Sequence, residues 1–192
     1  MDQPVTDWME PWQPLVDAVG REFDAGAEPV WGERIDPAMV ARYLEPLEYD
    51  CRDGDGAPAI PDTALFTLSV PLLWHPGQPP IFLSDQRDAV PAGASVGGRL
   101  CGLEPPTTAV LAVQWDTDFL MSARIGDRLG RRGLLLVACR PKQTRLGRGA
   151  FLTWQTEIIN AQCEVLARIR STLYRYVPAA AAVPERSRQS DV

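Results

Sequence analysis

Residues 108–177 decide the fold of this chain, and they read TAVLAVQWDTDFLMSARIGDRLGRRGLLLVACRPKQTRLGRGAFLTWQTEIINAQCEVLARIRSTLYRYV. Near the start of this stretch, Val113, Trp115 and Phe119 alternate with polar side chains, which predicts a strand with one face toward solvent. The six consecutive apolar residues at 134–139 predict a strand that is buried on both faces. The stretch as a whole predicts an antiparallel sheet.

Residues with turn chemistry separate the strand-like segments of this stretch. Glycine tolerates the positive backbone angles of tight turns, and aspartate and asparagine bond to nearby backbone groups. The predicted connections are residues 125–128, 142–149 and 160–162, and the predicted later strands are residues 151–160 and 165–177.

The residues before this stretch predict two short helices and one strand. Apolar residues recur at helical spacing over residues 7–23, where two prolines limit the helix to the part after Pro14. Residues 30–35 predict a strand that joins the sheet. Asp36, followed by proline, predicts the start of a second helix, which Pro46 closes.

A short apolar segment at residues 64–70 is the candidate for a helix enclosed by the sheet. It is apolar almost all round, as such a helix requires, although a buried strand fits so short a run equally well. Residues 48–61 before it are acidic and glycine-bearing, which predicts a loop. Residues 74–106 after it predict a long irregular connection of the kind that forms lids and binding loops.

Length and composition predict one domain over residues 1–177 and a disordered tail over residues 178–192. No apolar run approaches the roughly 20 residues that span a bilayer. The first ten residues are acidic and lack an apolar core, unlike a secretory signal. We therefore expect a cytoplasmic protein with no membrane contact.

Charge is unevenly distributed along the chain. The formal net charge is -6, but residues 108–177 contain eleven basic and five acidic residues, so this block carries +6 and the rest -12. A basic face on an acidic protein favours a phosphorylated small ligand or an acidic carrier protein over nucleic acid. The alternative is that the arginines only solvate the outer face of the sheet.

The four cysteines are widely spaced and form no C-x-x-C motif. This spacing favours reduced structural thiols over a metal or redox site. We expect neither a metal ion nor a cofactor.

Five short motifs in this order resemble the MaoC-like dehydratase family, in particular its N-terminal-half or FAS1-like dehydratase type. The similarity covers residues 12–177. The motifs are DFL at 118–120, IGDRL at 125–129, GRGAF at 147–151, EIIN at 157–160 and ARIRST at 167–172.

The resemblance implies an α+β hot-dog fold, in which an antiparallel sheet wraps around a central helix and two such units join edge to edge. It also implies an enoyl thioester of coenzyme A or of an acyl carrier protein as substrate, bound in a tunnel where the units meet. Catalytic members add or remove water with an Asp-x-x-x-x-His pair on the loop before the central helix, which shares the general acid and base work.

This chain departs from that pattern in the loop that should carry the pair. Asp50 can take the aspartate position, but Asp55 stands where the histidine is needed, and the loop is shortened. The only histidine, His75, follows the central segment in a Pro-Gly turn. Asp50 and Asp55 are weak catalytic candidates, because a carboxylate pair can do acid and base chemistry only if one pKa is raised.

The leading hypothesis is a non-catalytic, substrate-framing half of a heteromeric enoyl-thioester hydratase or dehydratase, whose partner hot-dog subunit supplies Asp and His. Lys142, Arg145 and Arg148 are the candidates to bind the carrier's phosphates or pantetheine. They lie on a loop where Gly147 and Gly149 allow close backbone approach. An exposed, solvated hairpin is the alternative for these residues.

Two other functions stay open. One is a self-sufficient homomeric hydratase that works through Asp50 and Asp55. The other is a structural or binding hot-dog protein without catalysis, and a hot-dog thioesterase is a weaker option. The acyl group, the carrier, the direction of reaction and the number of partner chains are open as well.

Overall fold

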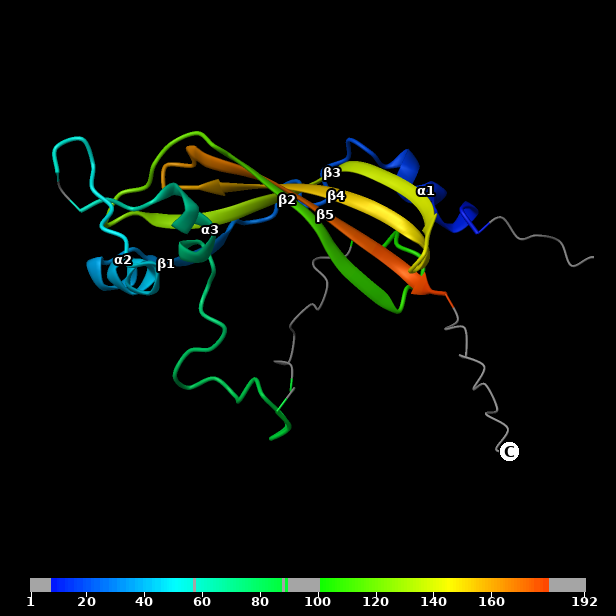
Figure 1. Ribbon diagram of the computed structural model, residues 1–192, viewed down its shortest axis with the longest axis horizontal. Helices are drawn as coiled ribbons and strands as arrows, with labels where there is room; N and C mark the ends of the chain where they lie inside the picture. The colour runs from blue at the N-terminus through cyan, green and yellow to red at the C-terminus, as the bar shows by residue number, and fades with distance from the viewer. Residues whose placement is uncertain (1–7, 57, 88, 90–100, 180–192) are drawn as a thin grey trace, which may run out of the picture.

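The computed structural model describes residues 8–56, 58–87, 89 and 101–179, so the predicted tail lies outside the described residues from residue 180 onward. Five strands form one curled antiparallel sheet in the order β1-β3-β4-β5-β2 (Figure 1). The strands are β1 Val30–Arg34, β2 Ala109–Phe119, β3 Arg128–Thr144, β4 Gly147–Ile159 and β5 Val165–Pro178. This confirms the predicted antiparallel sheet.

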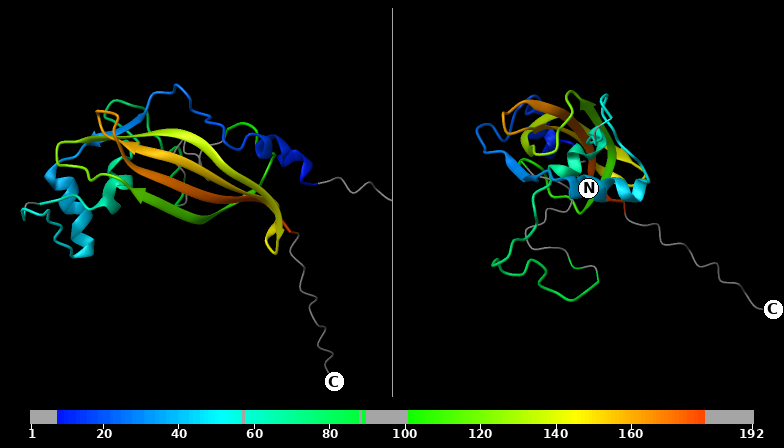
Figure 2. Two further views of the ribbon diagram at one scale, coloured as in Figure 1. Left: turned by 90° about the horizontal axis from the view of Figure 1, so that it is seen from above. Right: turned by 90° about the vertical axis from the view of Figure 1, so that its left-hand side faces the viewer.

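The helices are short and lie on the two ends of the sheet (Figure 2). They are η1 Glu10–Trp12, α1 Gln13–Asp17, α2 Pro37–Leu44, η2 Glu45–Leu47, η3 Asp62–Ala64 and α3 Leu65–Leu68. Among the described residues, no helix is long and apolar enough to cross a membrane.

The prediction for α2 is confirmed, and the prediction for the first helix needs correction. The Asp36 side chain accepts a hydrogen bond from the Met39 backbone N–H at 2.8 Å, as an N-cap does. At the N-terminus, however, helical structure begins before Pro14 and not after it. Pro11 and Pro14 lie in the first turns of η1 and α1, where the missing N–H groups have no helical partner in any case.

The turns follow the predicted chemistry. Gly126 has φ +97°, and the Asp127 carboxylate accepts a bond from the Arg124 N–H at 2.7 Å. The Asn160 side chain accepts bonds from the N–H groups of Gln162 and Glu164 at 3.0 and 2.9 Å. Backbone geometry in both connections is thus fixed by local side chains.

One burial prediction is wrong. The run at residues 134–139 is not buried on both faces: Leu134 and Leu136 are buried, whereas Val137 is exposed. Burial alternates only from Leu134 to Leu136, and a register shift between Leu136 and Ala138 interrupts it. The edge of β3 is partly covered by backbone, because the Phe23 N–H donates to the Leu134 carbonyl at 3.0 Å.

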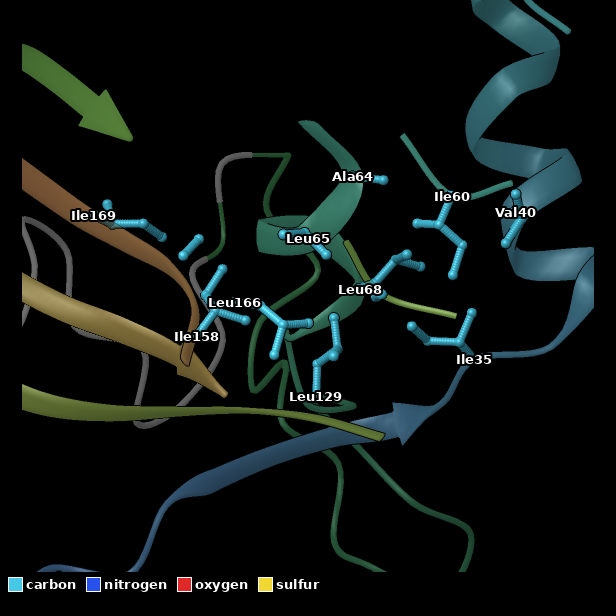
Figure 3. Packing of buried hydrophobic residues seen from close by; sticks show 12 residues of the cluster. Ile35, Val40, Ile60, Ala64, Leu65, Leu68, Leu129, Ile158, Leu166 and Ile169 are labelled. Atoms are coloured by element: carbon cyan, nitrogen blue, oxygen red, sulfur yellow. The ribbon is translucent and has the colours of Figure 1, made fainter. Parts of the chain in front are cut away.

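The first hydrophobic core surrounds α3 at one end of the concave face (Figure 3). Leu65 and Leu68 of α3 point toward Leu129 and Leu166 of the sheet. The segment predicted at 64–70 is therefore a helix and not a strand. The helix is a single turn. It is not buried on all sides, because the side chains of Phe66 and Val70 are exposed.

The second core lies at the other end of the concave face, under α1. Its buried members are Trp12, Leu15, Leu134, Leu136, Cys139, Ala150, Leu152 and Trp154. The Phe23 ring meets Trp154 edge to face, with centroids 5.7 Å apart. The concave face thus has two separately covered ends and a central part that the one-turn α3 does not cover.

Strand β2 forms one edge of the sheet and differs from the strands beside it. It pairs with β5 on one side, and no described residue pairs with its outer side. Its large apolar side chains Leu111, Val113, Trp115 and Phe119 are exposed. The prediction of a strand with only one face toward solvent is wrong for this chain, because the apolar and the polar side chains of β2 are both exposed.

Candidate functional site

The loop before α3 holds both weak catalytic candidates, but it does not bring them into one pocket. The Asp50 carboxylate accepts a hydrogen bond from Arg52 Nε at 2.9 Å in an exposed ion pair. It borders a shallow depression beside α2 and η2. Asp55 lines a separate hollow of about 950 Å³ between this loop and residues 121–125. Two residues that line this hollow are linked, because the Asp62 carboxylate accepts a hydrogen bond from the Ser122 hydroxyl at 2.9 Å.

The single histidine lies outside both hollows. His75 is exposed in a small loop, where its backbone N–H donates to the Gln78 side chain at 3.1 Å. Neither hollow counts His75 among its lining residues. In the described part of the chain, no group of three or more His, Cys, Asp and Glu could hold a metal ion.

The basic candidates lie at the opposite end of the sheet, around the β3–β4 turn (Figure 1). Only Arg145 and Leu146 form the turn, because Lys142 and Arg148 are strand residues and not loop residues as predicted. The side chains of all three basic residues are exposed. Arg148 Nε donates to the Gln143 side chain at 3.2 Å.

The glycines of this hairpin are explained by strand packing. Gly149 is buried, and a Cβ atom there would collide with the carbonyl oxygen of Arg175 on β5. A close backbone approach was predicted at Gly147 and Gly149. In the structure, the backbone that comes close to both glycines is that of β5. The Tyr174 hydroxyl lies 2.9 Å from the carbonyl oxygens of both Lys142 and Gly147, which ties the base of the turn to β5.

Several arginines of the basic block pair with acidic side chains across the outer face of the sheet. Glu157 of β4 accepts bonds from Arg132 at 3.0 Å and from Arg168 at 3.3 Å. Arg170 pairs with Asp118 of β2 at 3.2 Å. For these residues the alternative of a solvated outer face is correct, and such exposed pairs stabilise a fold only weakly.

A pocket of about 540 Å³ occupies the uncovered centre of the concave face, between the two cores. Its walls are largely aromatic and aliphatic, and Phe66 and Trp115 meet there edge to face at 5.0 Å. The Arg131 guanidinium lies over the Phe66 ring, 5.4 Å from its centroid. Trp154, Ser171 and Leu173 also line the pocket.

Sequence reasoning missed this pocket. Arg131 and Arg132 are neighbours in a strand, so their side chains point to opposite faces and one of them must face the concave side. The sequence therefore did indicate an arginine on the concave face. No feature of the sequence indicated that α3 would be a single turn, which leaves the pocket open.

All four cysteines are free thiols, among which Cys139 is buried and Cys163 exposed. Burial, and to a lesser extent the nearby Cys101, raise the pKa of the Cys139 thiol to about 11. A protonated thiol is a poor nucleophile and a poor metal ligand. Cys139 therefore behaves as a small core residue.

Comparison with known proteins gives structural neighbours only. No family model matches the chain, and no curated protein matches it. The solved ChsH1-ChsH2 complex from Mycobacterium tuberculosis contains a chain with a TM-score of 0.56 and 14% identity, matched over 93% of this chain and 96% of that one.

Two further solved structures match with lower scores. A MaoC-like dehydratase from Rhodospirillum rubrum has a TM-score of 0.47 and 15% identity over 85% of this chain and 95% of its own. An (R)-hydratase from A. caviae involved in PHA biosynthesis has a TM-score of 0.45 and 14% identity over 83% and 96%. Together with the strand order and the packing of α3 against the sheet, the match to the M. tuberculosis chain over 93% of this chain shows that this chain has an α+β hot-dog fold.

Proposed function

We propose that this chain is the substrate-framing subunit of a MaoC-like enoyl-thioester hydratase or dehydratase, in which a second hot-dog chain supplies the catalytic Asp and His. The substrate is the thioester of coenzyme A or of an acyl carrier protein. A cytoplasmic location is part of this proposal. The exposed apolar edge strand β2 is the observation that carries it.

The edge strand supports a partner that adds strands to the same sheet. Long, apolar edge strands are rare in monomers, because their free N–H and C=O groups recruit other chains. Here the edge runs over the eleven residues of β2 and continues into exposed Leu120 and Met121. A second hot-dog sheet would pair with this edge and cover its side chains.

The chemistry of the loop supports a partner that differs from this chain. The chain has one histidine, and His75 lies outside both hollows that border the loop before α3. Asp50 is held in an ion pair with Arg52 rather than beside a proton-transfer partner. The solved neighbour from M. tuberculosis is itself a complex of two differently named chains. These observations favour a heteromer over a homodimer.

The proposed assembly gives the basic hairpin a role across the interface. Two strands related by a two-fold axis pair antiparallel, so the Ala109 end of β2 would meet the far end of the partner's edge strand. The strand register places Gly149 and Lys142 at this Ala109 end. Strand spacing puts the hairpin roughly 10 to 15 Å from the edge. Lys142, Arg145 and Arg148 would then bind the carrier's phosphates near the partner's catalytic loop.

Reconstitution tests this proposal. The chain and the hot-dog protein that co-purifies with it are assayed separately and together for loss of the ultraviolet absorbance of an enoyl-CoA. We expect turnover by the complex and none by this chain alone. Turnover by the purified chain alone, with loss on Asp50→Asn, would instead identify the self-sufficient hydratase.

A further inference from the structure

The segment that follows α3, residues 70–83, carries large apolar side chains that this chain leaves exposed. Its sequence is VPLLWHPGQPPIFL. The exposed apolar side chains are those of Val70, Leu72, Leu73, Trp74, Phe82 and Leu83. The exposed fraction is 68% at Leu73 and 81% at Leu83. Figure 1 shows this segment running from α3 away from the sheet. We call residues 70–83 the apolar arm.

The apolar arm is free of charged side chains, and so is α3. Residues 63–84 contain no Asp, Glu, Lys or Arg, although these types make up 23% of the chain. Contiguous exposed apolar surface marks places where another molecule binds, and the core of a protein interface is depleted in charge. The composition of the arm is therefore that of an interface and not that of a solvated loop.

Hydrogen bonds within the arm hold its central turn in one shape. The Gln78 N–H donates to the His75 carbonyl at 3.1 Å, and the Gln78 side chain accepts a bond from the His75 N–H at 3.1 Å. The Trp74 indole N–H donates to the Gln78 carbonyl at 3.0 Å. The polar atom of this ring is thus already paired, so a partner can bury the ring without leaving an unpaired donor. Prolines in the arm restrict its backbone, which lowers the entropy cost of docking.

The base of the arm adjoins the exposed edge strand β2. The Phe66 ring of α3 meets Trp115 of β2 edge to face, with centroids 5.0 Å apart, and both side chains are exposed. A molecule that covers Trp115 therefore reaches the base of the arm. The free backbone groups along the β2 edge favour a protein strand over a lipid surface, because lipid cannot satisfy them.

The edge strand by itself offers too small a surface for a stable complex. Its eleven residues extend over roughly 36 Å, and a strip about 10 Å wide along them presents roughly 360 Å². Stable interfaces bury about 800 Å² per partner. The arm supplies further exposed apolar surface directly beside this strip.

We propose that the apolar arm extends this interface by packing into an uncharged, apolar groove of the partner hot-dog chain, beside the partner's edge strand. Leu73, Phe82 and Leu83 are the main contacts, because they are the most exposed large side chains of the arm. The identity of the partner rests on the proposed function. The long connection after α3 thereby has a role in assembly.

Photo-cross-linking in the native complex tests the place of the arm. The full chain, with p-benzoylphenylalanine in place of Leu83, is expressed in its own source, and the purified complex is irradiated. We expect mass spectrometry to find cross-links to the second, different hot-dog chain. The same photo-reactive residue in place of exposed Val137, on the side of the sheet away from β2, should give none to that chain. Cross-links from position 83 only to another copy of this chain, or no cross-link to the partner, would overturn the proposal.

A pair of polar substitutions measures how much the arm contributes to association. Leu73→Ser with Leu83→Ser should weaken the complex about 30-fold or more, because two large side chains would leave an apolar contact. Sedimentation of a dilution series of the complex measures this loss.

Val19→Ser with Val137→Ser is the matched control, because both valines are exposed and lie at β3, away from β2. Association should stay unchanged in the control, and far-ultraviolet circular dichroism should stay unchanged in both pairs. Equal weakening by the two pairs, or none by the arm pair, would contradict the proposal.

The two proposals can fail separately. If the arm cross-links to a second, different chain but their complex does not hydrate enoyl thioesters, only the proposed function is wrong. If the complex is active but the arm variants leave association unchanged, only the role of the arm is wrong.

Discussion

Strands β4 and β2 have the same alternating pattern in the sequence but opposite surroundings in the structure. On β4, Leu152, Trp154 and Ile158 are 0%, 5% and 1% exposed. On β2, Trp115 and Phe119 are 54% and 44% exposed. A pattern of apolar residues thus shows that a face is to be covered, and does not show which chain covers it. The difference between the two strands is the main support for a partner subunit.

Charged substitutions on β2 should have the largest effect, and they should act on assembly rather than on folding. We expect Val113→Lys with Phe119→Lys to weaken association by at least about 1,000-fold, about 4 kcal/mol, because two ammonium groups would be buried. Size-exclusion chromatography with light scattering measures this loss.

The control for this variant has the same charge change at exposed polar positions. Gln114→Lys with Gln162→Lys should leave association nearly unchanged. If the two double variants weaken association equally, the apolar side chains of β2 do not form the interface.

Truncation on β4 should act on folding instead. Ile158→Ala removes a side chain from the core around α3, and should lower the free energy of unfolding of the isolated chain by about 2 to 5 kcal/mol. Val113→Ala, an exposed position on β2, should cost about 0.5 kcal/mol or less. Urea denaturation measures both. Similar costs would mean that β2 is already buried in the isolated chain.

The basic hairpin should affect substrate affinity in the complex by a smaller amount. Arg145→Ala with Arg148→Ala should raise KM for an acyl-CoA about tenfold, about 1.4 kcal/mol, with little change in kcat, because these residues would bind a part of the substrate remote from the reaction. Arg140→Ala is the control. Equal KM values for both variants would remove the hairpin from the substrate site.

The smallest effect contrasts a buried with an exposed thiol. At pH 8.5 the Cys139 thiol, with its pKa of about 11, is almost entirely protonated, so iodoacetamide should modify it about 100-fold more slowly than exposed Cys163. Modification of Cys139 should accelerate as the pH approaches 11. Peptide mass spectrometry follows both sites. Equal rates in the folded chain would show that the core under α1 is open, and urea should abolish the difference.

Much of the fold could be predicted from local chemistry. The Asp36 cap, the Gly126–Asp127 turn and the Asn160 reversal depend on nearest neighbours in the chain, and the structure confirms them. The burial of the apolar run at residues 134–139 could not be predicted, because it depends on which faces the short helices reach. The exposure of β2 was missed for the same reason.

The candidate sites were less predictable, because they depend on long-range placement. Sequence reasoning treated Asp50 and Asp55 as one loop pair, yet they border different hollows. The pocket around Arg131 depends on register between strands and on the length of α3. Neither quantity is encoded in a short motif.

The composition of the native assembly tests the central claim most directly. Mild affinity purification of this chain from its own source, followed by native mass spectrometry, gives the mass and the identity of each stoichiometric partner. We predict a complex with a second, different hot-dog chain that carries an Asp-x-x-x-x-His motif. A homomer of this chain alone would contradict the account, and Asp50 and Asp55 would become the residues to test.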